Sequence, residues 1–157
     1  MRAPAVDEQG LPTTIRSYID RVQVSEGQKI AFESDADIGP IAPNVALACL
    51  RIVQEGLANA VRHSHAKNLR VYLKRVDHNV TVSVHDDGVG FDVKLALARA
   101  TNHGSVGLLS MRERAALAGG ICEIESSVGH GSRVSATFRT ERVAGVNNGE
   151  LRSRRPL

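Results

Sequence analysis

A chain of 157 residues, 42% of them hydrophobic, is long enough for one domain with a real core, and the scarcity of aromatic residues (3%, no Trp) predicts that this core is aliphatic. No apolar run approaches the roughly 20 residues that cross a bilayer, no secretory leader is visible, and the two cysteines lack metal-ligand spacing, so we expect a cytoplasmic domain with reduced thiols. The net charge of +3 is compatible with nucleic-acid binding, but the absence of an aromatic-interleaved basic stripe or nucleic-acid motif argues against that class.

The first third of the chain is predicted to form a helix, a short strand and a longer helix. A helix over 11–22 has Pro12 in its first turn, and a strand over 29–33 and a loop over 34–42 follow. Over 43–64, apolar residues recur at spacings of three and four, which predicts a helix with one buried face. The residues of that face are Val45, Cys49, Ile52, Val53, Gly56 and Ala60.

The opposite face of this second helix carries polar side chains that suggest a site. Glu55, Asn59 and His63 are four residues apart, so they line up along one side of the helix. Small residues cluster beside them, as if to make room for a ligand. An ordinary solvated face is the alternative, and it explains the charged residues better than it explains the small ones.

A hairpin and a glycine turn come next. Alternating apolar residues predict strands over 69–76 and 79–85, with a turn at 77–78 between them. The segment Asp86-Asp87-Gly88-Val89-Gly90-Phe91 follows directly, and its two glycines let the backbone approach a ligand closely. An Asp-Gly turn alone is more often an ordinary hairpin turn. The polar helix upstream is what favours a binding site here.

A second glycine-containing segment opens another helix. After a loop with a weak helix over 94–99, the stretch 104–107 precedes a helix over 107–117, which ends at Gly119-Gly120. Free N–H groups and the positive end of the dipole at such a helix start can hold phosphate. An ordinary glycine-rich loop with a serine cap is the alternative.

The last two strands complete the expected sheet. Strands over 121–126 and 133–138 form a second hairpin around 128–131, and a mobile, arginine-rich tail is expected from 143 onward. Helices and a mixed sheet of this kind assemble in two layers. The predicted fold class is therefore an α+β two-layer sandwich.

Taken together, these segments resemble the ATP-binding domain of sensor histidine kinases. Residues 54–63 (QEGLANAVRH) are similar to its N box and 86–91 (DDGVGF) to its first glycine box. Residues 105–114 (SVGLLSMRER) resemble the second glycine box, in the version typical of the nitrate/nitrite-sensor subfamily of two-component kinases. The resemblance runs from about Asp7 to Arg139. It implies the Bergerat fold, in which a mixed, mostly antiparallel sheet is covered on one face by helices.

The resemblance also implies a role for individual residues, with ATP and Mg²⁺ as ligands. Asp86 would accept a hydrogen bond from the adenine exocyclic amine, and Gly88 and Gly90 would let the backbone pass close to the base. Asn59 would offer an oxygen to Mg²⁺. Glu55 would either orient a metal-bound water or act as a base, and the resemblance leaves that choice open.

Other matching residues would surround the base and the phosphates. Arg62 would meet phosphate charge unless it is merely solvated, and His63 would lie against the adenine unless it merely caps the helix. Residues 91–105 resemble the ATP lid and are expected to order on nucleotide binding. Serine replaces glycine at Ser105 and Ser110, which departs from the general family pattern. The remaining residues placed at the nucleotide are Gly104, Ser105, Val106, Gly107, Leu108 and Ser132.

None of the six histidines resembles the phosphoacceptor of this family. Residues 1–10 resemble the junction to a separate dimerisation and phosphoacceptor domain; 11–142 would be the catalytic domain and 143–157 the basic tail. We therefore expect a monomeric fragment that binds Mg·ATP without autophosphorylating alone. In a homodimeric parent kinase, membrane-anchored or not, it would pass the γ-phosphoryl to a histidine for relay to a response-regulator aspartate. A stand-alone GHKL serine kinase of the anti-sigma type and a non-catalytic nucleotide-binding signalling module are the alternatives.

Overall fold

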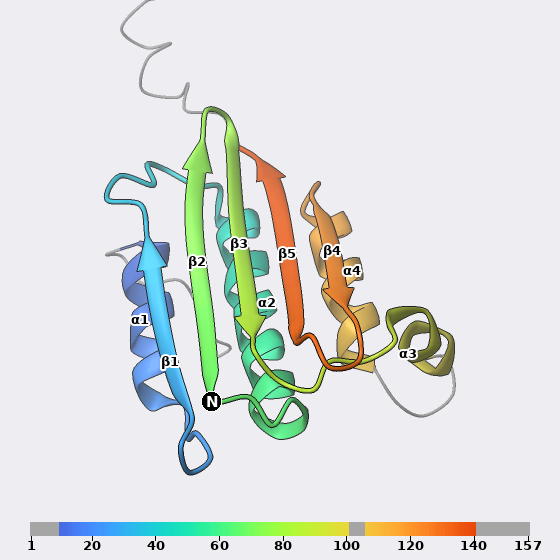
Figure 1. Cartoon of the computed structure of the whole chain (residues 1–157). Coiled ribbons are helices and arrows are strands. Elements are labelled where there is room, and N and C mark those ends of the chain that lie inside the picture. Colours follow the sequence, from blue (N-terminus) through green and yellow to red (C-terminus); the bar gives the residue numbers. More distant parts are fainter. Residues whose placement is uncertain (1–9, 101–105, 141–157) are drawn as a thin grey trace, which may run out of the picture.

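The computed structural model describes residues 10–100 and 106–140 of the chain. Within these ranges, helices and strands alternate irregularly along the sequence, and Figure 1 shows the longer helices behind a single sheet and the short helix α3 (Val93–Ala100) beside its edge. The elements in chain order are α1 (Leu11–Arg21), β1 (Lys29–Ser34), α2 (Pro43–His63), β2 (Asn68–Val76), β3 (Asn79–Asp86), α3 (Val93–Ala100), α4 (Val106–Leu117), β4 (Ile121–Ser126) and β5 (Ser132–Arg139).

The sheet has five strands in the order β1-β2-β3-β5-β4. Only β1 and β2 pair in parallel, and the other three pairings are antiparallel. Helices α1, α2 and α4 cover one face of the sheet (Figure 1). The predicted two-layer α+β sandwich, with a mixed and mostly antiparallel sheet, is confirmed.

The core lies between the helices and the covered face of the sheet. Strand β3 contributes Val80, Val82 and Val84, each at most 3% exposed, as its alternation predicted. The apolar stripe predicted on α2 is buried along its whole length. The expectation of an aliphatic core needs one correction, because the Phe138 side chain is 1% exposed and is among the largest fully buried side chains.

Phe138 fits because the residue opposite it has no side chain. A Cβ on Gly120 would overlap the Phe138 ring. The pair Gly119-Gly120 therefore has two functions: it ends α4, as predicted, and it leaves space for the one large aromatic ring of the core. The Gly120 N–H donates to the Ala115 carbonyl oxygen at 2.7 Å, which closes the helix end.

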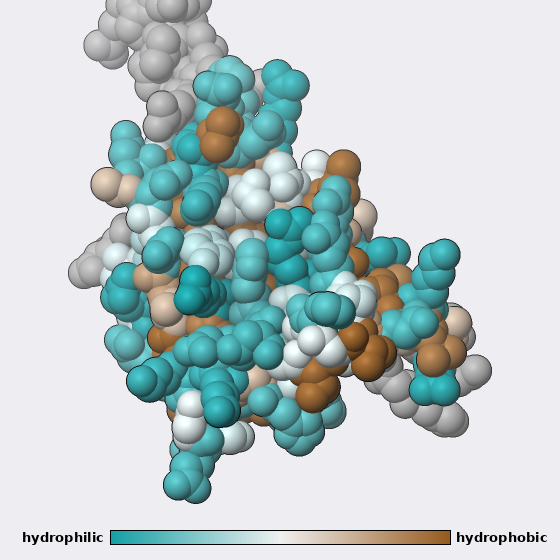
Figure 2. Space-filling model, in the orientation of Figure 1, coloured by the Kyte–Doolittle hydropathy of each residue, from teal (hydrophilic) through white to brown (hydrophobic). Residues whose placement is uncertain are grey.

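The other face of the sheet is open to solvent and polar. On it, the Thr81 and Thr137 hydroxyl groups lie 3.0 Å apart across β3 and β5. Figure 2 shows this face, most of which is hydrophilic, with separate hydrophobic spots. Strand residues that alternation directs inward therefore lie on the side of the sheet that the helices cover.

Several element boundaries differ slightly from those expected from the sequence. Strand β3 extends to Asp86, and β5 already begins at Ser132, because these two residues pair with each other. The weak helix expected over 94–99 is longer, and its Val93, Ala96 and Leu97 side chains pack against the core. Asp92 caps the start of this helix, since its Oδ1 accepts the Leu95 N–H at 3.0 Å.

Candidate functional site

A cavity of about 530 Å³ opens between α2, the ends of β3 and β5 and the start of α4. Its walls bring together most of the residues predicted for the nucleotide site. These residues are Glu55, Asn59, Arg62, His63, Asp86, Gly90, Gly107, Leu108 and Ser132. The three motifs, far apart in sequence, therefore converge on one pocket.

The pocket also has lining residues that sequence reasoning did not assign to it. They are Gly56, Ala60, Ser64, Val84, Phe91 and Val134. Strand alternation directs Val84 and Val134 toward the helices, so the signal for these two was present in the sequence. Gly56 lies where a Cβ would stand 3.1 Å from Val84 Cγ2, so the small residues of α2 let the helix approach the sheet beside the pocket.

The polar wall of the pocket is formed by α2 and the start of α4. Gly107 lies directly against the polar face of α2, where a Cβ would overlap Glu55 Oε1 and stand 3.1 Å from Asn59 Nδ2. Glu55 and Asn59 are each partly buried. A carboxylate and a carboxamide thus lie side by side, and only glycine at position 107 leaves both of them room.

Asp86 forms the opposite end of the pocket. It is the last residue of β3, where it pairs with Leu69 on one side and Ser132 on the other. Its Oδ1 accepts the Gly88 N–H at 2.9 Å. Burial raises the pKa of Asp86 above its ordinary value, while hydrogen bonds from Gly88 and from the backbone and hydroxyl of Ser132 partly oppose this effect.

The two glycines after Asp86 have different surroundings. Gly90 lines the pocket and has a positive φ of 67°, which favours glycine. Gly88 is not among the lining residues, and a Cβ there would overlap the backbone of Ser64. The Val89 N–H donates to the Ser64 carbonyl oxygen at 2.8 Å. Gly88 therefore joins the glycine turn to the end of α2, which fixes the two walls of the pocket relative to each other.

The second acid of the motif is structural rather than a pocket residue. Asp87 Oδ1 accepts the N–H groups of Lys67 and Asn68 at 2.9 and 3.0 Å. Its Oδ2 accepts the Asn68 side-chain amide at 2.9 Å. These bonds lower the pKa of Asp87, the backbone bond from Asn68 having the largest effect. Asp87 thus ties the start of β2 to the turn that carries Asp86.

Arg62 and His63 lie at the exposed rim of the pocket, on the last turn of α2. Arg62 Nε donates to the Ala58 carbonyl oxygen at 3.3 Å, which leaves the rest of the guanidinium exposed. The residue that ends the helix is Ser64, whose hydroxyl donates to the Ala60 carbonyl and accepts the Ala66 N–H. The capping role considered for His63 therefore belongs to Ser64.

The remaining sequence predictions concern the segment before α4. Gly104 and Ser105 lie outside the described residues, and Val106 is the first residue of α4. The phosphate contacts expected of these residues and the ordering of the lid stay predictions.

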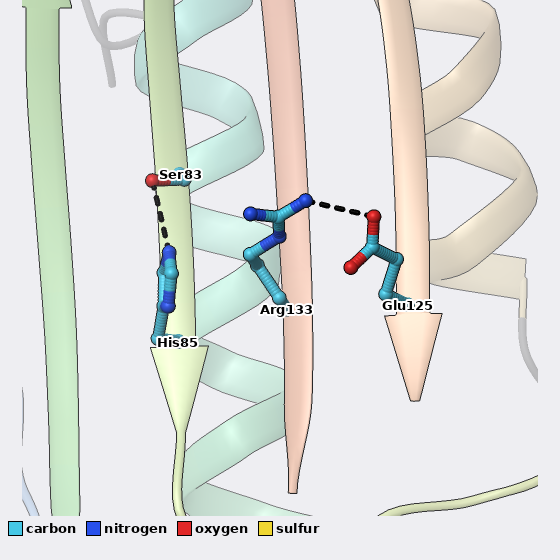
Figure 3. Close-up of polar contacts among 4 residues, drawn as sticks. All are labelled: Ser83, His85, Glu125 and Arg133. Atoms are coloured by element: carbon cyan, nitrogen blue, oxygen red, sulfur yellow. Dashed lines mark hydrogen bonds and ion pairs between the residues drawn. The ribbon is translucent and has the colours of Figure 1, made fainter. Parts of the chain in front are cut away.

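A second, more open cavity of about 420 Å³ lies on the other side of Asp86 and Ser132, at the polar face of the sheet. Figure 3 shows three of its lining residues, His85, Glu125 and Arg133, with the neighbouring Ser83: His85 Nε2 lies 3.2 Å from Ser83 Oγ, and Arg133 pairs with Glu125 at 2.7 Å. Burial, followed by the nearby Arg133, lowers the pKa of His85. Across residues 10–100 and 106–140 no cluster of three or more metal-ligating side chains is found.

Both cysteines are buried, free thiols, as expected from their isolated positions. Burial raises the pKa of Cys49 to about 12 and that of Cys122 to about 11. Neither residue lines the pocket.

The polar wall suits a magnesium ion that is held mainly by a bound triphosphate. Glu55 and Asn59 offer hard oxygen atoms, which Mg²⁺ prefers, and a single protein ligand or two is usual when substrate phosphates supply the others. The donor set therefore fits a nucleotide-bound ion better than a resident metal, which would need more protein ligands.

Comparison with known proteins gives one family match over residues 44–142, to the model described as "Histidine kinase-, DNA gyrase B-, and HSP90-like ATPase". An uncharacterized sensor-like histidine kinase from Chloroflexus aurantiacus is 35% identical over 138 residues, covering 86% of this chain and 23% of that protein. The histidine-protein kinase/phosphatase DegS from Bacillus subtilis is 33% identical over 134 residues, covering 83% of this chain and 34% of DegS. The chain thus spans about a quarter to a third of these relatives.

A solved structure has the same fold. The full-length protein ShkA, crystallised in complex with AMPPNP, matches with a TM-score of 0.67 at 21% identity, over 88% of this chain and 31% of ShkA. As for membrane insertion, the part of the chain that the structure describes has no helix that is long and apolar enough to cross a bilayer.

Proposed function

Since the chain belongs to the family of histidine kinase-, DNA gyrase B- and HSP90-like ATPases, we propose that it is the catalytic ATP-binding domain of a sensor histidine kinase. The observation that carries this proposal is the single pocket in which Asp86, Asn59 and Glu55 face a common space. Both relatives described above are histidine kinases by name, which favours this function over the stand-alone serine kinase of the anti-sigma type.

The base of ATP is proposed to bind at the Asp86 end of the pocket. A carboxylate accepts a hydrogen bond from the adenine amine, whereas the guanine carbonyl would place a second acceptor against it. An unsatisfied buried acceptor costs about 1–3 kcal/mol, so this contact alone favours ATP over GTP by roughly tenfold or more. The base would have apolar surroundings on the sheet side, formed by Val84, Phe91 and Val134.

The phosphates are proposed to extend along α2 toward the start of α4. The Asn59 carboxamide would hold Mg²⁺ together with the triphosphate, and the bound ion would neutralise phosphate charge. Arg62, with most of its guanidinium exposed, is available for phosphate charge at the rim. Glu55 would then orient a water molecule of that ion or accept the proton of the attacking imidazole.

Transfer requires an acceptor from outside this domain. Within the described residues, His63 is the only histidine that lines the pocket. The helix that carries it does not resemble the phosphoacceptor helix of this family. We infer that a histidine of a separate dimerisation domain enters the pocket in a homodimeric parent and that a response regulator then takes the phosphoryl group. The motif at 105–114 supports placing the parent kinase in the nitrate/nitrite-sensor subfamily. The proposed use of ATP supports a cytoplasmic location for this domain.

The test is phosphotransfer in trans. The domain is incubated with Mg·ATP labelled at the γ-phosphate, with and without the phosphoacceptor domain of the parent kinase. We expect labelled phosphohistidine on the added domain only, and an Asn59→Ala variant should reduce it by about 100-fold or more, since both metal and phosphate positioning are lost. Phosphohistidine on the isolated chain, or none on any partner, would contradict the proposal.

A further inference from the structure

The hydroxyl group of Ser126 links two turns beside the proposed base site. Ser126 is the last residue of β4, and its Oγ accepts the Phe91 N–H at 2.8 Å. The same hydroxyl donates to the Gly131 carbonyl oxygen at 2.8 Å. A hydroxyl group has one proton and two acceptor sites, so Ser132 is the donor in the 2.9 Å contact between Ser132 Oγ and Ser126 Oγ. Ser126 thus bonds all of these partners at once, although it does not itself line the pocket.

Phe91 is the pocket residue that this hydroxyl group fixes. It directly follows the glycine turn, and its side chain lines the pocket and packs against the core. Two residues earlier, the Val89 N–H and carbonyl groups are bonded to the end of α2 and to the β4–β5 turn. One residue later, Asp92 caps the start of α3. The hydrogen bond from Phe91 to Ser126 therefore fixes the backbone between these two anchored points.

This hydrogen bond controls the direction of the Phe91 side chain, because it acts on the backbone that carries the ring. The residue before Phe91 is Gly90, which has a positive φ of 67° and, as a glycine, can adopt many other backbone conformations. Without the Ser126 oxygen, the partly buried Phe91 N–H needs another acceptor. A rotation at Gly90 that turns this N–H toward water also moves the phenyl ring.

We propose that Ser126 is a positioning residue of the base site: its hydroxyl group holds the Phe91 backbone so that the Phe91 side chain stays in the pocket wall. The inference deepens the proposed function and rests on it, because it assumes that the base of ATP lies against that wall. The phenyl ring contacts the base, whereas Ser126 acts only through Phe91.

Two other roles of Ser126 would have different consequences for nucleotide affinity. Through its contact with Ser132 Oγ, it would act on another residue of the pocket. As a purely structural link between two turns, it would weaken nucleotide binding by the same factor whichever side chain lines the pocket. Only the positioning of Phe91 makes the effect of Ser126 on affinity depend on the phenyl ring.

The experiment is a double-mutant cycle in which calorimetry measures the affinity for Mg·ATP. Ser126→Ala should weaken binding about three- to tenfold, as the loss of one hydrogen bond predicts, and Ser126→Thr, which keeps the hydroxyl group, should stay within about twofold of wild type. Phe91→Ala removes the ring but keeps the backbone N–H. In that background Ser126→Ala should weaken binding by less than about twofold, because no ring is left to misplace. Ser127→Ala, at the exposed serine next in the sequence, is the matched control and should bind ATP as wild type does.

A second background, Ser132→Ala, separates the two routes into the pocket. Ser126→Ala should keep its full effect on affinity there, since its action through Phe91 does not need the Ser132 hydroxyl group. Loss of the effect in this background, an equal effect with and without the Phe91 ring, or unchanged affinity in Ser126→Ala would each overturn the inference. So would wild-type affinity for ATP in Phe91→Ala.

Failure of the proposed function has a different signature, because the wild-type domain itself would then take up no ATP. Thermal unfolding of every variant verifies that affinities are compared between folded proteins. Should Ser126→Ala fail to fold, Ser126→Cys, whose thiol is a weak acceptor, takes its place in both backgrounds. Should Phe91→Ala fail to fold, Phe91→Leu, which also lacks the ring, takes its place.

Discussion

The neighbours of Asp86 determine its pKa and its capacity to accept a further hydrogen bond. Asp86 has a raised pKa because it is half-buried, yet it sits beside two donors, Gly88 and Ser132, that keep its charged form accessible. A carboxylate in this setting is fit to accept one further hydrogen bond from a ligand. The proposed role in base recognition needs the charged form, because a protonated carboxyl group has lost part of its acceptor capacity.

A pH dependence of nucleotide binding follows at this scale. Because the pKa of Asp86 is raised above 3.8, the carboxylate takes up a proton on acidification earlier than an ordinary aspartate would. We expect affinity for ATP to fall as the pH drops through that raised pKa, and Asp86→Asn to bind more weakly but without this component. Calorimetry of both proteins across the same pH series removes the titration of the nucleotide itself, and circular dichroism verifies folding at each pH. Parallel pH curves for the two proteins would contradict the role of Asp86.

The packing of α4 against α2 determines the geometry of the polar wall at the scale of elements. Gly107 is the second residue of α4, and its Cα lies so close to Glu55 and Asn59 that there is no room for a side chain between them. A methyl group there would meet the far end of a flexible carboxylate rather than a rigid backbone. The helix can therefore keep its place while Glu55 moves.

This contact predicts an unusual separation of activity from stability in Gly107→Ala. Alanine favours a helix by about 1 kcal/mol over glycine, so the variant should unfold no earlier than wild type. Displacing Glu55 should nevertheless reduce phosphotransfer to the acceptor domain about tenfold to 100-fold, with little change in ATP affinity. Thermal unfolding, calorimetry and the transfer assay measure the three quantities.

Gly119→Ala is the matched control for that substitution. Gly119 has a φ of +80°, and no atom lies within 4 Å of where its Cβ would be. Alanine there is strained by about 1–2 kcal/mol and should lower the unfolding temperature while leaving transfer unchanged. A stable Gly107→Ala that transfers phosphate at the wild-type rate would rule out a positional role for Glu55.

Some of these elements were predictable from the sequence, and others depend on tertiary contacts. The stripe of α2 and the alternation of β3 gave correct elements, because burial of one face imposes periods of 3.6 and 2.0 residues. That Asp86, Asn59 and Glu55 would line one pocket was predictable from the motifs that contain them. Gly88 was expected beside the base, but the reason for glycine there is the Ser64 backbone, which lies 24 positions away and leaves no local pattern.

The same reasoning explains why the hydrogen bonds of Ser126, the last residue of β4, were not predicted. Its partners Phe91, Gly131 and Ser132 meet only when β4 and β5 pair and the glycine turn folds over them. A serine at a strand end is common, and periodicity carries no information on the direction of a hydroxyl proton. Asp87 is a similar case, since its three hydrogen bonds to the start of β2 are visible only in the folded chain.

At the scale of the whole molecule, the two faces of the sheet differ in what they contact. The covered face and its helices build the core and the pocket, and the open face remains polar (Figures 1 and 2). Asp86, at the end of β3, and Ser132, at the start of β5, line both cavities. The contacts of Gly88 with Ser64 and of Asp87 with β2 hold this end rigid, so the proposed base site is preformed between the two layers.

The most direct test of the account is calorimetric titration of the folded chain with ATP in the presence of Mg²⁺, for wild type and for Asp86→Asn at neutral pH. The account predicts one binding site per chain in wild type and an affinity at least about tenfold weaker in the variant, since a charged acceptor is replaced by a neutral amide. No uptake of ATP by well-folded wild type, or equal affinity in the two proteins, would contradict it.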